Sequence, residues 1–279
     1  MISLVEKYLP ALAVGDRIER RAVLEKIFAD EGLSPVVQTE EKSETNPYSV
    51  TNYFIFPKTD DAFPLFCAHY DAIPGTCGAN DNAVGVCILI KMAKALAEVG
   101  ISAGFVFFDG GSGGHYGAKL FRTAHKNVKF SAVINLDMCG YGDTIAVYSR
   151  ANPKKEGISA FCNSERLEAH GGKLVNFLPE SDDVCFKTHE QPVLSVAVVP
   201  RWDMKYLDVL ASYQGNFFGK PPEYGMMLEQ MEVMTTVSGA FRDEPKYIQP
   251  KAALQVYEYL LDAVMSGTEK KRKIGLFGL

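Results

Sequence analysis

Three side chains from separate segments of the chain are of types that bind zinc. His69 and Asp137 each follow an apolar run that predicts a buried strand, and Asp81 lies in a polar segment between them. One imidazole nitrogen and two carboxylate oxygens, with a further position open, form the ligand set of a catalytic zinc site. Asp71, two residues after His69, could orient the imidazole and fix its tautomer.

Each of these residues also has an ordinary explanation. A lone histidine at a strand end is often a satisfied polar residue, Asn80 or Asp81 could cap the following helix, and Asp137 could only support a loop. Ligands of open α/β sheets bind outside the carboxyl ends of the strands. The joint occurrence of these residues in that region therefore favours a metal site.

The segment Asp109–Gly117 follows another apolar run and contains five glycines among nine residues. Such a loop could cradle a phosphate or present Ser112 as a nucleophile. It contains neither of the glycine patterns of phosphate-binding loops, with their lysine or their downstream ribose-binding acid. A phosphate-binding function is therefore excluded.

A serine hydrolase is a second interpretation of the same loop, because Ser112 lies in a Gly-x-Ser-x-Gly pattern between a predicted strand and a predicted helix. An aspartate and then a histidine would have to follow it. The available pairs are Asp137 with His170 and Asp182 with His189. The chain has no His-Gly-Gly segment to form an oxyanion hole, so this interpretation is the weaker one.

Composition and charge exclude several classes of protein. The net charge of −5 argues against non-specific binding to nucleic acid, which needs a basic face. No apolar run reaches the roughly 18 residues of a membrane helix, and Glu6 interrupts any signal peptide. We therefore expect a cytoplasmic protein, whose six scattered cysteines are free thiols in a reducing compartment.

Strand and helix patterns alternate along the chain, which predicts an α/β fold with a mixed, largely parallel central sheet and helices on both faces. Strands are predicted at 52–56, 64–68, 103–108, 130–136, 144–149, 174–177 and 193–199, and helices at 16–31, 82–99, 115–126, 157–169, 203–211 and 250–265.

Several segments closely resemble the co-catalytic zinc aminopeptidases of metallopeptidase family twenty-eight, whose fold glutaminyl cyclases share. Ala68–Asp71 and Gly78–Gly85 carry the most specific motif, and Asn135–Met138 matches the next ligand segment. Ser181–Phe186 and Asp243–Ile248 are weaker matches. The resemblance extends from about residue 50 to the end and implies a single aminopeptidase-like domain, 1–279. In it, residues 1–50 form a helical N-terminal segment and 213–235 an irregular insertion near the cleft.

The resemblance implies roles for the residues singled out above. In that family two zinc ions share an aspartate that matches Asp81, and the first ion also binds the residues that match His69 and Asp137. All three are present here, so we expect one zinc site to remain.

The second metal site and the general base of the family are missing from this sequence. The family pattern Asp-Ala-Glu-Glu-x-Gly-x-x-Gly corresponds to Asp109–Gly117, which places Gly111 at the base position and Ser112 at a second-metal position. The last ligand, a histidine in the family, corresponds to Gly239. The three departures from the family pattern all affect one functional unit, the general base together with the second metal site.

Other side chains could substitute for the missing groups. Asp71 could act as a base besides orienting His69, and further substitutes are Asp109, His115, Cys77 and Cys139. Two functions remain open. One is a weak aminopeptidase-like hydrolase that uses one zinc ion to act on peptides or small amino-acid derivatives. The other is an inactive pseudopeptidase that binds peptides or a protein partner. The oligomeric state is left open.

Overall fold

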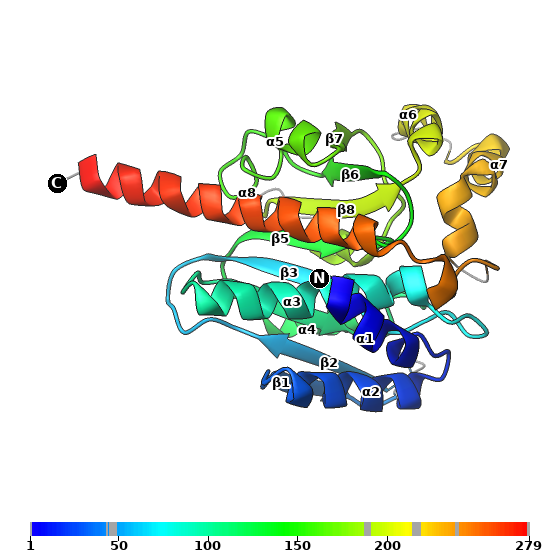
Figure 1. Cartoon of the computed structure of the whole chain (residues 1–279), viewed down its shortest axis with the longest axis horizontal. Coiled ribbons are helices and arrows are strands. Elements are labelled where there is room, and N and C mark those ends of the chain that lie inside the picture. Colours follow the sequence, from blue (N-terminus) through cyan, green and yellow to red (C-terminus); the bar gives the residue numbers. More distant parts are fainter. Residues whose placement is uncertain are drawn as a thin grey trace.

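A twisted eight-stranded sheet runs through the centre of the molecule (Figure 1). The computed structural model describes residues 2–42, 44, 49–186, 191–213, 219–237 and 240–277, with side chains described from Leu4 to Gly267 within those ranges. The strand order is β1-β2-β4-β3-β5-β8-β6-β7. The strands are β1 (Val36–Glu40), β2 (Val50–Ile55), β3 (Phe63–His69), β4 (Gly104–Phe108), β5 (Phe130–Leu136), β6 (Thr144–Ser149), β7 (Gly172–Val175) and β8 (Val193–Val199).

The four middle strands, β4, β3, β5 and β8, are parallel, whereas β1, β2 and β6 join through antiparallel pairs. Side chains of β3 alternate between the two faces, as the pleat requires. Phe66 and Ala68 belong to one hydrophobic core, and Leu65 and Cys67 belong to another. The sheet is thus buried on both faces, which confirms the predicted α/β class.

Helices cover both faces of the sheet (Figure 1). One face carries α1, α3 and α8, which contact one another, while α4 packs on the other face beside β2. Among the described residues, no helix is long and apolar enough to cross a membrane. The helices are α1 (Ile2–Leu12), α2 (Arg17–Asp30), α3 (Val84–Glu98), α4 (Tyr116–Ala124), α5 (Ser164–Ala169), α6 (Met204–Ser212), α7 (Pro222–Gln230) and α8 (Pro250–Phe277).

Some elements differ from the sequence-based expectation. The N-terminal segment 1–50, expected to be helical, contains α1 and α2 but also the edge strand β1, which was not predicted. The segment 213–235, expected to be irregular, contains α7 and the 3-10 turn Glu232–Thr236. The helix expected at 157–169 is shortened to α5. The hydrophobic patterns of β1 and α7 are weak, because β1 is exposed on both faces and no side chain of α7 is buried.

The parallel strands bring three acidic or imidazole residues to one edge of the sheet. His69 is the last residue of β3, Asp109 follows β4, and Asp137 follows β5. Because β3 lies between β4 and β5 in the sheet, these residues converge although more than 25 positions separate neighbours in the sequence.

The N-terminal helices are joined to α3 by one carboxylate. Glu31, at the end of α2, accepts hydrogen bonds from Tyr8 of α1 at 2.6 Å and from Lys94 of α3 at 2.5 Å. Bonds from Lys94 and Tyr8 lower the pKa of Glu31 to about 2. The ionised carboxylate therefore stabilises the packing of three helices.

Replacing Glu31 by glutamine should make stability less dependent on acid pH. Since the pKa is lower in the folded than in the unfolded chain, the stabilisation is complete above about pH 4.5 and is lost as the pH falls toward 2. We expect Glu31→Gln to cost about 1–2 kcal/mol at pH 7, allowing for solvent screening, and less at pH 3, where part of the stabilisation is already lost. Urea unfolding at both values measures this. Asp30→Asn, in an exposed pair with Lys26, is the control, and an equal cost at both pH values would contradict the assignment.

Candidate metal site

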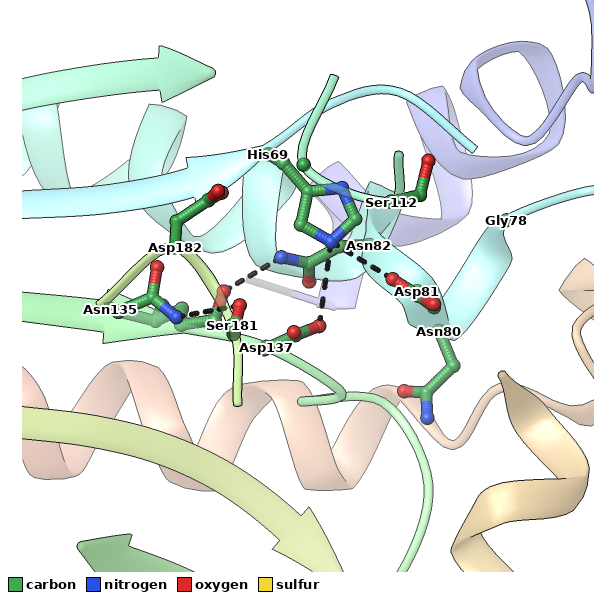
Figure 2. Close-up of polar contacts among 12 residues, drawn as sticks. His69, Gly78, Asn80, Asp81, Asn82, Ser112, Asn135, Asp137, Ser181 and Asp182 are labelled. Atoms are coloured by element: carbon green, nitrogen blue, oxygen red, sulfur yellow. Dashed lines mark hydrogen bonds and ion pairs between the residues drawn. The ribbon is translucent and has the colours of Figure 1, made fainter. Parts of the chain in front are cut away.

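The three predicted ligands lie together at the carboxyl edge of the sheet (Figure 2). Nε2 of His69 is 2.9 Å from Oδ1 of Asp81 and 3.8 Å from Oδ1 of Asp137. One ligand atom of each residue lies within 4.8 Å of the others. This spacing suits a single metal ion held by one nitrogen and two oxygens.

The electrostatics of the site favour a bound cation. Burial tends to lower the pKa of His69, but the surrounding carboxylates, Asp137 first and then Asp71 and Asp81, outweigh it and raise that pKa well above its usual value. Burial and the nearby charge of Asp137 raise the pKa of Asp81. Oδ1 of Asp137 is buried without a hydrogen-bond partner. Together, the unpaired oxygen and the crowded carboxylates fit a divalent ion.

Asp71 supports His69 from the side opposite the two aspartates. Its Oδ1 lies 3.3 Å from Nδ1 of the imidazole, which leaves Nε2 facing the ligand group. Asp71 also accepts hydrogen bonds from the Gly111 amide at 2.8 Å, from the Ser112 amide at 3.1 Å and from the Ser112 hydroxyl. Burial opposes ionisation, but His69 and these donors hold the pKa of Asp71 well below its usual value.

A short turn with π-helical hydrogen bonding, Ala79–Ala83, delivers Asp81 to the site. Oδ1 of the buried Asp243 accepts the amide of Asn80 at 2.7 Å and that of Asp81 at 3.3 Å. Burial and the charge of Asp81 raise the pKa of Asp243 to about 7. The Asp243 carboxyl group thus holds the backbone segment that carries the carboxylate of Asp81.

The expectation that Asn80 or Asp81 caps the next helix is wrong. The cap position of α3 is Ala83, and it makes no side-chain capping bond. The Asn80 side chain instead donates to Thr236 at 2.6 Å and accepts the Gly140 amide at 2.7 Å. The polar run therefore builds a metal-binding turn rather than starting a helix.

Two further asparagines tie the ligand segments together (Figure 2). Asn82 donates to the carbonyl of Leu136 at 2.7 Å, one residue before the ligand Asp137. Asn135 donates to the Ser181 hydroxyl at 3.0 Å. Because these bonds are buried, the turn that carries Asp81 and the end of β5 are held in a fixed relation.

Gly111 has no space for a side chain. A Cβ atom there would lie 2.4 Å from Cβ of His69, 2.5 Å from its Cγ and 3.0 Å from Oδ2 of Asp182. The residue at the family's general-base position is therefore packed directly against a candidate ligand. A glutamate would require the backbone or His69 to move.

Asp109 is not available as a substitute ligand or base. Its carboxylate pairs with Arg17 through both oxygens, at 2.7 and 2.6 Å. It also accepts the Thr51 amide at 2.9 Å. These bonds direct it away from the ligand group and give it a structural role.

His115 does not join the ligand group either. Its Nδ1 lies 3.0 Å from Oδ1 of the fully buried Asp182. The bond to Asp182 raises the pKa of His115. His115 has a left-handed backbone at the start of α4, with φ of 62°. The loop thus aims the imidazole at Asp182 instead of at the metal ligands.

Neither cysteine beside the ligand segments belongs to the metal-binding group found among the described residues. Cys139 is buried, its thiol contacts the carbonyls of Asp137 and Val196, and burial raises its pKa. Cys77 packs against the main core. Both cysteines are therefore placed as ordinary core thiols, and neither is positioned to supplement the ligand group.

The geometry does not support a serine nucleophile. The Ser112 hydroxyl donates to Asp71, and His170 lies elsewhere, 3.2 Å from Asp262. Asp137 and His170 therefore do not assemble with Ser112. His189 of the other pair, like Gly239 at the family's last ligand position, lies outside the described residues.

Sequence reasoning missed two arginines of α2 that contact the site's loops. Arg17 binds Asp109, and the fully buried Arg20 binds the carbonyls of Cys77 and Gly78. A signal was present, because Arg20 lies at helical spacing with Leu24 on an otherwise apolar face.

Adding a methyl group at Gly111 should disturb the site. Gly111→Ala places Cβ against His69, so we expect a loss of roughly 1–3 kcal/mol of stability, as for other overpacked sites, together with weaker metal binding. Gly113→Ala is the matched control, because that glycine is exposed and has no positive φ. Urea unfolding measures the difference. Equal stability of both variants would show that the Gly111 loop adapts freely.

Solved structures with the same fold include both aminopeptidases and glutaminyl cyclases. The Porphyromonas gingivalis glutaminyl cyclase has a TM-score of 0.67 at 19% identity, with 95% of this chain and 96% of that chain covered. For the Legionella pneumophila LapA aminopeptidase the TM-score is 0.65 at 11% identity, with coverage of 95% and 71%. For BSAP, a zinc aminopeptidase from Bacillus subtilis, it is 0.55 at 20% identity, with coverage of 80% and 51%.

These likenesses establish the fold, since all three identities are low. No curated protein matches the sequence. The sequence does match the family described as peptidase family M28 over residues 54–235, which is more than half of the chain. This range includes His69, Asp81 and Asp137, so the chain that carries this ligand group belongs to peptidase family M28.

Proposed function

We propose that the protein holds one zinc ion on His69, Asp81 and Asp137 and acts on the amino-terminal end of peptides as a weak aminopeptidase-like hydrolase. The observation that carries the proposal is the convergence of three ligand atoms within 4.8 Å, one of them a buried carboxylate oxygen without a partner. Membership of family M28 supports zinc and a peptide substrate.

A zinc ion at this site would supply Lewis-acid polarisation of a peptide carbonyl. The chain's own residues prepare the site for it. Ionised Asp71 holds the His69 ring so that Nε2 presents its lone pair to the ligand group. Asp243 and Asn82 fix the turn that carries Asp81.

Hydrolysis should be slow because the usual position of the general base is occupied by Gly111. Asp71, whose carboxylate accepts the Gly111 amide, is held by three donors of the Gly111–Ser112 loop and has a lowered pKa. It is therefore a poor proton acceptor. General acid–base catalysis contributes roughly 10²–10⁴-fold to rates, and a deficit of this size is what we expect here.

Binding without turnover is the competing function, favoured by the same loop. The amides and hydroxyl that face Asp71 make the Gly111–Ser112 segment a support for His69. A protein of this kind could use the zinc ion and the cleft to hold peptide amino termini. Glutaminyl cyclisation is also worth testing, since the Porphyromonas gingivalis glutaminyl cyclase is matched over nearly its whole length.

Metal content should be one zinc ion per chain. Removing the imidazole by His69→Ala should lower zinc affinity by at least tenfold, because a nitrogen ligand is lost and two close carboxylates are left unbridged. Elemental analysis and titration calorimetry measure this. His170→Ala is the matched control, since that histidine pairs with Asp262. A zinc-free wild-type protein, or equal affinity of both variants, would refute the site.

Turnover should be weak and dependent on the metal ligands. We expect slow release from amino-acid anilides in the presence of zinc, cobalt or manganese, lost in His69→Ala and kept in His170→Ala. An amino-terminal glutamine substrate tests cyclisation in parallel. Absence of turnover, combined with zinc-dependent binding of a peptide amino terminus, would establish the non-catalytic function instead.

A further inference from the structure

Helix α2 lies outside the region that matches family M28, yet its first turn contacts two loops of the metal site. Arg17 and Arg20 are three positions apart, so they project from the same face of the helix. Arg20 binds the loop that precedes Asp81, and Arg17 binds the residue that precedes the glycine segment.

Arg20 is buried completely and serves the backbone instead of a carboxylate. Its Nη2 donates to the Gly78 carbonyl at 2.6 Å, and its Nη1 donates to the Cys77 carbonyl at 3.1 Å and to the Val14 carbonyl at 3.4 Å. Within the described part of the chain, the hydrogen bonds of Arg20 all go to backbone carbonyls. Burying such a charge costs several kcal/mol, so its retention points to a specific task.

That task is visible at Gly78. Its carbonyl accepts both Arg20 and the Ala83 amide, at 3.1 Å, and the second bond closes the turn over Asp81. Gly78 has a φ of 56°, and a Cβ atom there would lie 2.4 Å from Nη1 of Arg20 and 2.9 Å from the Asp81 carbonyl. The Arg20 guanidinium therefore packs directly against Gly78, and Gly78 packs directly against the backbone of the ligand Asp81.

Two side chains of opposite character hold the backbone of the turn. Arg20 binds the carbonyl at its start, and the Asp243 carboxyl group accepts the amides of Asn80 and Asp81. A cation on a carbonyl and a carboxyl oxygen on amides both match the backbone dipoles. Loss of either one should let the turn relax.

Arg17 holds the second loop of the metal site, which begins at Asp109. It pairs with both oxygens of Asp109. Two and three residues later, the amides of Gly111 and Ser112 bind Asp71, which faces His69. A path of direct contacts therefore leads from α2 to the imidazole ligand.

We infer that the first turn of α2 sets the relative position of Asp81 and His69, with Arg20 and Arg17 as positioning residues for the metal site. The effect on metal affinity rests on the proposed function, whereas the effect on the two loops does not. An arginine that only stabilised the fold would loosen the protein as a whole instead of these two loops.

The test compares Arg20→Met, Arg20→Lys and Arg17→Met with Lys26→Met, whose side chain pairs with Asp30 on the same helix. Amide hydrogen exchange is measured first on metal-free protein. We expect at least tenfold faster exchange in residues 78–83 for Arg20→Met, partial recovery in Arg20→Lys, and faster exchange in 109–112 for Arg17→Met. Lys26→Met should leave both loops unchanged.

Zinc titration and the visible spectrum of bound cobalt are measured next. We expect affinity to fall about tenfold in Arg20→Met and less in Arg17→Met, with an altered cobalt spectrum in Arg20→Met that Arg20→Lys partly restores. Unchanged loop exchange in a folded variant would overturn the inference. Faster exchange with wild-type affinity and spectrum would also overturn the positioning role.

The position of the two loops can be tested separately from metal binding. A wild-type protein that binds neither zinc nor cobalt refutes the metal site, while loop exchange still decides whether α2 holds the loops. If Arg20→Met fails to fold, Arg17→Met decides the matter, because Arg17 is about one-third exposed and its loss is milder. Wild-type exchange at 109–112 in that variant would then count against the inference.

Discussion

The crowding of buried carboxylates around one imidazole is the constraint on which the site depends. Asp71, Asp81 and Asp137 all approach His69, and each would repel the others without compensation. The fold meets this cost with backbone amides, with a buried guanidinium nearby and with a space suited to a divalent ion. Much of the surrounding hydrogen bonding serves to keep like charges close together.

Much of the fold and of the ligand group could be predicted from the sequence, because both follow from strong local patterns. The β-branched and aromatic runs of β3, β5 and β8 identify their strands, and parallel order carries His69 and Asp137 to one edge. The missed elements have weak patterns. β1 is exposed on both sides, and α7 has no buried side chain.

The parts of the site that escaped prediction depend on contacts distant in sequence. Asp243 reaches a turn more than 150 residues earlier, and Arg17 meets Asp109 across 92 positions. No spacing rule reports such pairs. The same limit applies to the possible substitutes. His115 lies three positions after Ser112 and Cys139 two positions after Asp137, yet the left-handed backbone of His115 and the burial of Cys139 direct these side chains elsewhere.

The close packing of Gly111 on His69 has a consequence for any change to this loop. The imidazole and Asp182 already occupy the space that a side chain at this position would need. A glutamate introduced at position 111 would clash with its surroundings, since several neighbouring side chains would have to move together. A single substitution at position 111 is therefore not enough to place an acidic side chain there. An acidic side chain at this position would therefore require His69 and Asp182 to move apart first.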